Sequence, residues 1–112
     1  MKIAIPLTYG QLSAHFGHCE QFALVELDSS EKKTIATDYA ASPPHQPGVL
    51  PRWLHEQGVD VIIAGGMGQR AQQLFNQNGI KVVIGARCRP VQETIDDYLK
   101  GTLLTGENPC DH

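Results

Sequence analysis

The sequence has few of the features that would assign it to a common functional class. Its three cysteines are an odd number that cannot pair completely, so we read Cys19, Cys88 and Cys110 as thiols or metal ligands. No apolar run approaches the roughly 20 residues of a membrane-spanning helix, and the first residues lack the apolar core of a signal peptide. There is no basic run and the formal net charge is -3, which gives no reason to expect a nucleic-acid partner. We therefore expect a cytoplasmic protein that binds neither nucleic acid nor membrane.

Catalytic motifs are scarce as well. No serine lies in a nucleophile elbow, and the sequence has neither a Walker loop nor a GxGxxG segment. The carboxylates on the predicted strands form no obvious metal-dependent nuclease set. We therefore expect a binding protein rather than an enzyme, with thiol chemistry at Cys19, next to His15 and His18, as a weaker alternative.

What the sequence does contain is an alternation of strand and helix patterns within 112 residues, the size of one compact domain. Short apolar segments predict five strands, at 2–7, 22–27, 33–38, 59–64 and 80–85. Amphipathic spacing predicts three helices, the first ending near Gly58, the second near Gly79, and the third running from Pro90 to Lys100. This order predicts an α/β protein with a mixed five-stranded sheet. The first, fourth and fifth strands should be parallel, and the second and third should form an antiparallel hairpin.

The unusual polar residues fall in loops that should meet at one edge of this sheet. In α/β sheets, ligands gather at the carboxyl ends of the parallel strands. HFGHC (15–19) follows the first predicted strand, GGMG (65–68) the fourth, and GARCRP (85–90) the fifth. His45 precedes the first helix, which must begin at the same edge in order to descend to the start of the fourth strand. We therefore expect any binding site at this edge.

Several of these residues are candidate metal ligands: His15, His18, Cys19, Cys110 and His112. Thiolate and imidazole suit zinc, copper(I), iron or sulfide clusters rather than magnesium or calcium. The spacings HxxHC and CxH do not match a closed zinc finger. The last two candidates lie in the C-terminal tail, which reaches about 36 Å when extended and could fold back to the same edge. The alternative is that the loop histidines are solvated polar residues and that the tail is an ordinary chain end.

The glycines Gly65, Gly66 and Gly68 also have two interpretations. They could simply permit a tight turn from strand to helix. Alternatively, backbone amides at the start of the helix could hold an anion, such as phosphate or an anionic metal cluster, with Arg70 adding positive charge.

Four segments, MKIAIP, HFGHCEQF, GVDVIIAGGMGQRAQQLFNQNGIKVVIGA and VQETIDDYLKGTL, resemble the dinitrogenase iron-molybdenum cofactor biosynthesis family. This family includes NifX-like and NafY-like proteins and the C-terminal domain of NifB. The resemblance covers residues 1–104, which we take as a single domain, and leaves 105–112 as a tail that carries cysteine and histidine. It implies a ribonuclease H-like three-layer fold without the nuclease carboxylates of that fold, and the binding or carriage of iron-sulfur-molybdenum cofactors.

The resemblance also implies site residues. It points to His15 and Gly17 of the HFG loop, to His45, and to the three glycines of GGMG. His18, Cys19 and the tail residues depart from the family pattern and add donors to it. We therefore expect a carrier or scaffold for an iron-sulfur or molybdenum-containing sulfide cluster. Its partners would be cofactor donor or acceptor proteins, and it would be a monomer or homodimer. The alternative is a regulatory module that binds a small anion or metabolite at the glycine turn.

Overall fold

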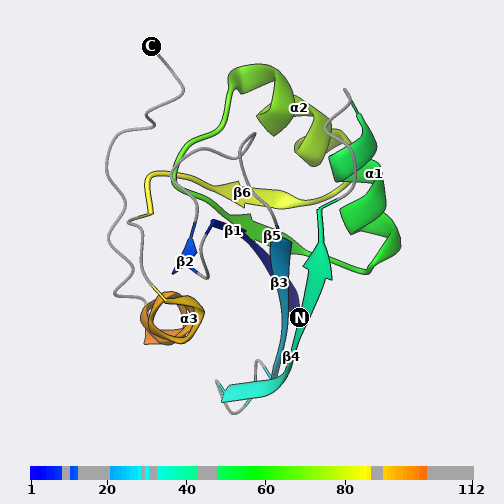
Figure 1. Ribbon diagram of the computed structural model, residues 1–112. Helices are drawn as coiled ribbons and strands as arrows, with labels where there is room; N and C mark the ends of the chain where they lie inside the picture. Colours follow the sequence, from blue (N-terminus) through cyan, green and yellow to red (C-terminus); the bar gives the residue numbers. More distant parts are fainter. Residues whose placement is uncertain are drawn as a thin grey trace.

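A computed structural model describes residues 1–8, 11–12, 21–28, 30, 33–42, 48–86 and 90–100. Within them, a mixed sheet has helices on both faces (Figure 1). The strands are β1 (Lys2–Thr8), β2 (Gln11–Leu12), β3 (Gln21–Asp28), β4 (Lys33–Ala41), β5 (Val61–Ile63) and β6 (Lys81–Val83). The helices are α1 (Val49–Glu56), α2 (Gln69–Gln77) and α3 (Val91–Lys100). No helix in these ranges is both long enough and apolar enough to cross a membrane.

The strands are arranged in the order β4-β3-β1-β5-β6, with β2 paired to β1. β1 pairs parallel with β5, and β5 pairs parallel with β6, whereas β3 and β4 form the antiparallel hairpin. The predicted strand directions are therefore confirmed. The predicted number of five strands is wrong, because the part of the chain that the structure describes already contributes six strands to the sheet. The additional strand, β2, pairs with β1 through Leu12 and Leu7. Because β2 has only two residues, it gives no period-two pattern in the sequence.

Helices α1 and α2 cover one face of the sheet. Phe22 and Ile62 belong to a buried cluster on this face that also includes Leu54 of α1 and Phe75 of α2. Each of these four side chains is 0% exposed. The two helices contribute their apolar stripes to this layer, as expected for amphipathic helices on a sheet.

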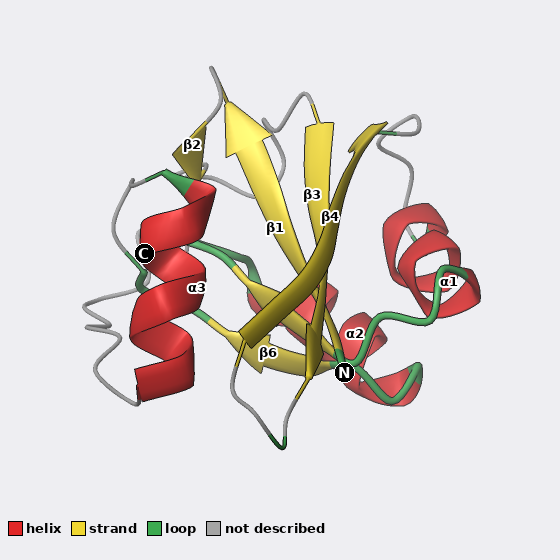
Figure 2. Cartoon of the chain, turned by 90° about the horizontal axis from the view of Figure 1, so that it is seen from below, coloured by secondary structure: helices red, strands yellow, loops and turns green. Residues whose placement is uncertain are grey.

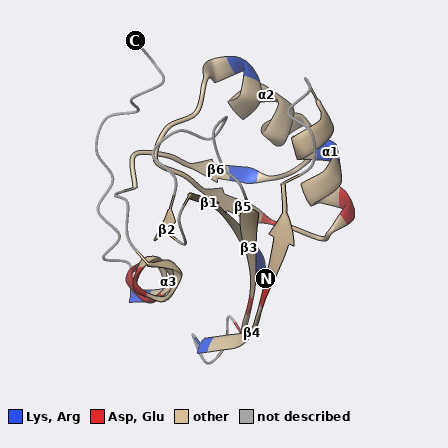
Figure 3. Cartoon of the chain, viewed as in Figure 1, with Lys and Arg blue, Asp and Glu red and all other residues tan. Residues whose placement is uncertain are grey.

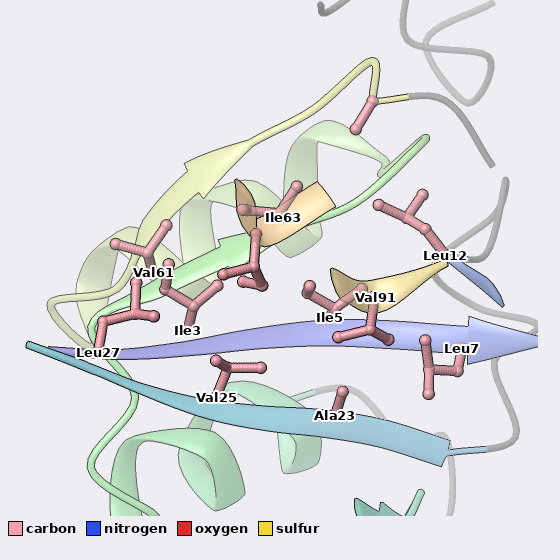
Figure 4. Close-up of a cluster of buried hydrophobic side chains, with 12 residues drawn as sticks. Ile3, Ile5, Leu7, Leu12, Ala23, Val25, Leu27, Val61, Ile63 and Val91 are labelled. Atoms are coloured by element: carbon pink, nitrogen blue, oxygen red, sulfur yellow. The ribbon is translucent and has the colours of Figure 1, made fainter. Parts of the chain in front are cut away.

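Helix α3 covers the other face, and Figure 2 shows it to the left of the strands, on the side away from α1. Ile3 and Ile5 of β1 alternate along the strand with Ala4, which faces the α1/α2 layer. They pack in a second cluster with Val91 and Ile95 of α3 (Figure 4). The structure is therefore three-layered, with helices, sheet and helix in that order.

Candidate functional site

The parallel strands end together at one edge of the sheet, which we call the rim. Ile63 of β5 pairs with Val83 of β6, and both residues are the last of their strands. The antiparallel strand β3 begins at the rim, because Gln21 pairs with Leu7 near the end of β1, and Ala41 at the end of β4 pairs with Gln21. The rim is thus the edge at which the sequence predicts a binding site.

The described residues next to the predicted ligand loops lie at this rim. Leu12 and Gln21, on either side of segment 13–20, both pair with Leu7. Ala86 donates its N–H to the carbonyl of Ala64, at the end of β5, over 3.2 Å. Pro90, on the far side of segment 87–89, forms a bridge to Gln11. The topology therefore brings the ends of these loops together as predicted.

Seven predicted site residues lie outside the described residues: His15, Gly17, His18, Cys19, His45, Cys110 and His112. Cys88 also lies outside them. Their convergence stays a prediction. Among the described residues, no group of three or more His, Cys, Asp and Glu side chains could hold a metal ion. The histidine in the described ranges is His55, an exposed residue in the last turn of α1, away from the rim.

The predicted glycine turn connects β5 to α2 at the rim. Gly65, Gly66 and Met67 are buried, whereas Gly68 and Arg70 are exposed. The first part of the turn, through Met67, is therefore buried, and the part that begins α2 is exposed to solvent.

Gly85 joins this turn to the loop after β6. Its N–H donates to the carbonyl of Gly65 over 2.8 Å. Gly85 has a φ of 82°, a left-handed conformation that costs other residues roughly 1–2 kcal/mol. This role of Gly85 could not be predicted, because nothing in the neighbouring sequence distinguishes it from a glycine that only ends a strand.

The N-terminus of α2 has no side-chain cap. Its N-cap residue is Gly68, and no acidic residue occurs in the first turn. The first hydrogen bond in the helix runs from the N–H of Gln72 to the carbonyl of Gly68, over 3.1 Å. The amides of 69–71 consequently have no acceptor within the helix, and the helix dipole adds partial positive charge there.

Arg70 lies in this first turn and is exposed. A cation at this end of a helix opposes the helix dipole, so Arg70 makes the start of α2 more positive rather than compensating it. Helix α1 on the same face also lacks a side-chain cap and first-turn acidic residues, and it carries the exposed Arg52. Figure 3 shows a basic segment at the start of α2 and another on α1, which also carries an acidic segment at its C-terminal end. This arrangement favours an anion.

Gly68 is not explained by the turn that contains it. Its φ of -65° and ψ of 154° are available to any residue, and a Cβ at this position would have no atom of the described ranges within 4 Å. The interpretation that glycine is needed for a tight turn therefore does not hold at Gly68. The described residues therefore leave room for a side chain at Gly68, next to the first turn of α2.

Two side chains that the sequence analysis missed hold this region in place. Gln72 donates from Nε2 to the carbonyl of Met67 over 2.9 Å, which fixes the turn to the helix that follows. Phe22, one residue after the start of β3, lies against Trp53 of α1 with ring centroids 5.7 Å apart. Trp53 is the single tryptophan of the chain, so its fluorescence can report changes at this end of the sheet.

Comparison with known proteins agrees with these observations. The sequence pattern of the family described as dinitrogenase iron-molybdenum cofactor matches residues 1–101. The protein MJ0580 of Methanocaldococcus jannaschii is 37% identical over 106 residues, which are 92% of this chain and 89% of that protein.

Solved structures show the same fold. The crystal structure of PH0822 has a TM-score of 0.86 and 27% identity, with 94% of each chain covered. The apo form of the orange protein from Desulfovibrio gigas has a TM-score of 0.72 and 23% identity, with 96% of this chain and 94% of that chain covered. At this identity the second likeness concerns the fold alone.

Proposed function

The chain belongs to the dinitrogenase iron-molybdenum cofactor family, and from this premise we propose that it carries or scaffolds a metal-sulfide cluster at the rim. The cluster is cargo rather than a catalytic centre, so the protein is a binding protein and not an enzyme. The family supports a role related to nitrogenase cofactor biosynthesis. The three layers and mixed sheet are compatible with the ribonuclease H-like fold that the sequence resemblance implies.

The observation that carries this proposal is the start of α2. An uncapped helix N-terminus and an exposed arginine form a positive end at the rim, next to a glycine where the described residues leave room for a side chain. Iron-sulfur and molybdenum-sulfide clusters are anionic when thiolates complete their coordination. Backbone amides at a helix N-terminus bind anions through hydrogen bonds and the helix dipole. The described part of the site therefore suits the charge of the cargo.

The metal donors in this proposal are the predicted ligands His15, His18, Cys19, Cys110 and His112, with His45 and Gly17 near the cluster. Thiolate and imidazole are donors that iron, copper and zinc accept, so this set suits a sulfide cluster rather than a hard cation. Because a transient cargo must leave, cofactor donor and acceptor proteins are the partners. The location that we propose is the cytoplasm, where a reducing environment keeps the cysteines available.

Reconstitution without oxygen tests the proposal. The protein is incubated with iron and sulfide, or with tetrathiomolybdate, then desalted and analysed for metal and sulfide. We expect the Cys19→Ser/Cys110→Ser double variant to bind less than half of the wild-type amount. His55→Ala is the matched control, because His55 lies away from the rim, and it should bind as much as wild type. Full metal retention in the cysteine double variant would refute thiolate ligation.

A second candidate function is a regulatory module that binds a small anion or metabolite. The same uncapped N-terminus of α2 supports it, since an anion could bind there without any thiolate. A thermal-shift screen separates the two functions. Stabilisation by phosphorylated metabolites and by no metal or cluster would favour this second function.

A further inference from the structure

We propose that the edge of β4 is a docking surface for a second copy of this chain, with residues 37–41 of the two copies paired antiparallel. Among the described residues β4 pairs only with β3, and it stands at the end of the sheet. Strands with an unpaired edge are templates for another strand. β4 also carries two exposed large apolar residues, Ile35 and Tyr39, which are 62% and 61% exposed.

The hydrogen bonds of β3 determine which residues of β4 have backbone groups directed outward. Leu27 and Met1 exchange both of their hydrogen bonds, at 2.7 and 3.1 Å, so Leu27 directs its backbone groups toward β1. Because direction alternates along a strand, Leu24 directs its groups toward β4, where its partner is Asp38. The next residue, Tyr39, therefore directs its N–H and carbonyl away from the sheet, and so do Thr37 and Ala41.

A β-bulge limits where a second strand can pair. The pairing passes from Leu27–Thr34 to Glu26–Ala36, so Ile35 has no partner in β3. Bulges twist and disrupt an edge, which protects the beginning of β4. The residues after the bulge pair regularly and form the usable part of the edge.

One register fits these residues best. With Tyr39 opposite the same residue of the second copy, Thr37 lies opposite Ala41 and Asp38 lies opposite Ala40. Backbone bonds would then form at the Tyr39 pair and at both Thr37–Ala41 pairs, about six in all. The tyrosines would meet on the α3 face, because Tyr39 is paired with Ala23 of that face. Aromatic pairs opposite each other stabilise a sheet.

Neighbouring registers are less favourable. Moving the centre to Asp38 would place two carboxylates opposite each other, which is destabilising. Moving it to Thr37 would bring the bulge at Ile35 into the pairing. The strand has no other charged residue between 34 and 41, so the proposed register brings no like charges together.

The proposed pairing includes the rim end of each β4, because Ala41 is the last residue of β4 and pairs with Gln21 at the rim. Antiparallel pairing points the rims of the two copies in opposite directions. Dimerisation is measured by mass and cluster binding by bound metal, so the two properties can be tested separately.

Sedimentation equilibrium of the full chain, from micromolar to millimolar concentration, tests the proposal. The weight-average mass should rise from the 12.3 kDa of one chain toward twice that value. Tyr39→Lys should keep the protein at the mass of one chain, because it places two cations opposite each other. Gln73→Lys makes the same charge change on the exposed side of α2 and should dimerise as wild type.

Two further variants test the backbone and the register. Thr37→Pro removes an N–H that points away from β3, so the circular dichroism should be retained while dimerisation is lost. Asp38→Asn should change the dimer affinity by no more than about two-fold, because Asp38 faces an alanine in this register. A mass of one chain at every concentration, or a dimer that persists in both Tyr39→Lys and Thr37→Pro, would overturn the proposal. Dimer affinity that rises strongly in Asp38→Asn would overturn the register.

Discussion

Replacing Gly68 by aspartate should stabilise the protein and weaken binding of its anionic cargo. The new carboxylate would accept hydrogen bonds from the first-turn amides of α2, and the space around a Cβ at this position is open. Capping contributes a few tenths of a kcal/mol relative to glycine. The charge at the helix N-terminus contributes about 0.3–1 kcal/mol. The loss of glycine freedom in the unfolded chain contributes about 0.4–1 kcal/mol.

Together these terms raise the free energy of unfolding by about 1–2 kcal/mol, which for a domain of this size raises Tm by roughly 4–8 °C. The same carboxylate would occupy the place of the cargo. At about 5 Å from a bound anion, it would repel that anion by roughly 1–3 kcal/mol after screening, which lowers affinity on the order of ten- to a hundred-fold.

The assay combines thermal denaturation with titration of tetrathiomolybdate, followed by the fluorescence of Trp53. Gly68→Asn is the matched control, because asparagine also caps a helix but carries no charge. It should raise Tm by less than aspartate does and should lower affinity less. If both variants bind as tightly as wild type, the anion does not sit at the start of α2 and the argument from its uncapped end is wrong.

Three further predictions concern single residues. Arg70→Gln should lower affinity for the anion about three- to ten-fold without lowering Tm, because the arginine opposes the helix dipole. Lys81→Gln, at the opposite edge of the sheet, is the control and should leave the affinity for the anion unchanged. Gly85→Ala should lower the free energy of unfolding by about 1–2 kcal/mol in urea denaturation because of its positive φ, and an unchanged value would show that this conformation carries no cost for alanine here. Phe75→Ala should cost about 3–5 kcal/mol in the same measurement, since this side chain is 0% exposed in the core under α2.

Much of the fold follows from local patterns in the sequence. The run VDVIIA is almost continuously apolar because β5 is buried on both faces, and the spacing of Val91 and Ile95 matches the stripe by which α3 contacts the sheet. The fourth and fifth predicted strands are too long, since β5 and β6 have three residues each, whereas β1, β3 and β4 extend beyond their predicted bounds. Val59 and Ala64 are buried beyond the ends of β5, so the apolar run in the sequence is longer than the strand itself.

Other features depend on contacts between distant residues and leave no local pattern. Strand β2 exists because Gln11 and Leu12 meet the end of β1, and the bulge at Ile35 appears only in the pairing of β4 with β3. The site likewise has features that follow from the sequence and features that only the structure shows. The position of the glycine turn at the rim was predictable from strand order, whereas the uncapped start of α2 and the left-handed Gly85 required the structure.

The most direct test of the account is elemental analysis, together with an absorption spectrum, of the protein purified without oxygen from cells supplied with iron and molybdenum. The account predicts bound metal with sulfide, a visible charge-transfer band from sulfur to metal, and loss of both in the Cys19→Ser/Cys110→Ser variant. Protein that contains no metal as isolated, and that takes up none when iron, sulfide and tetrathiomolybdate are supplied, would contradict it.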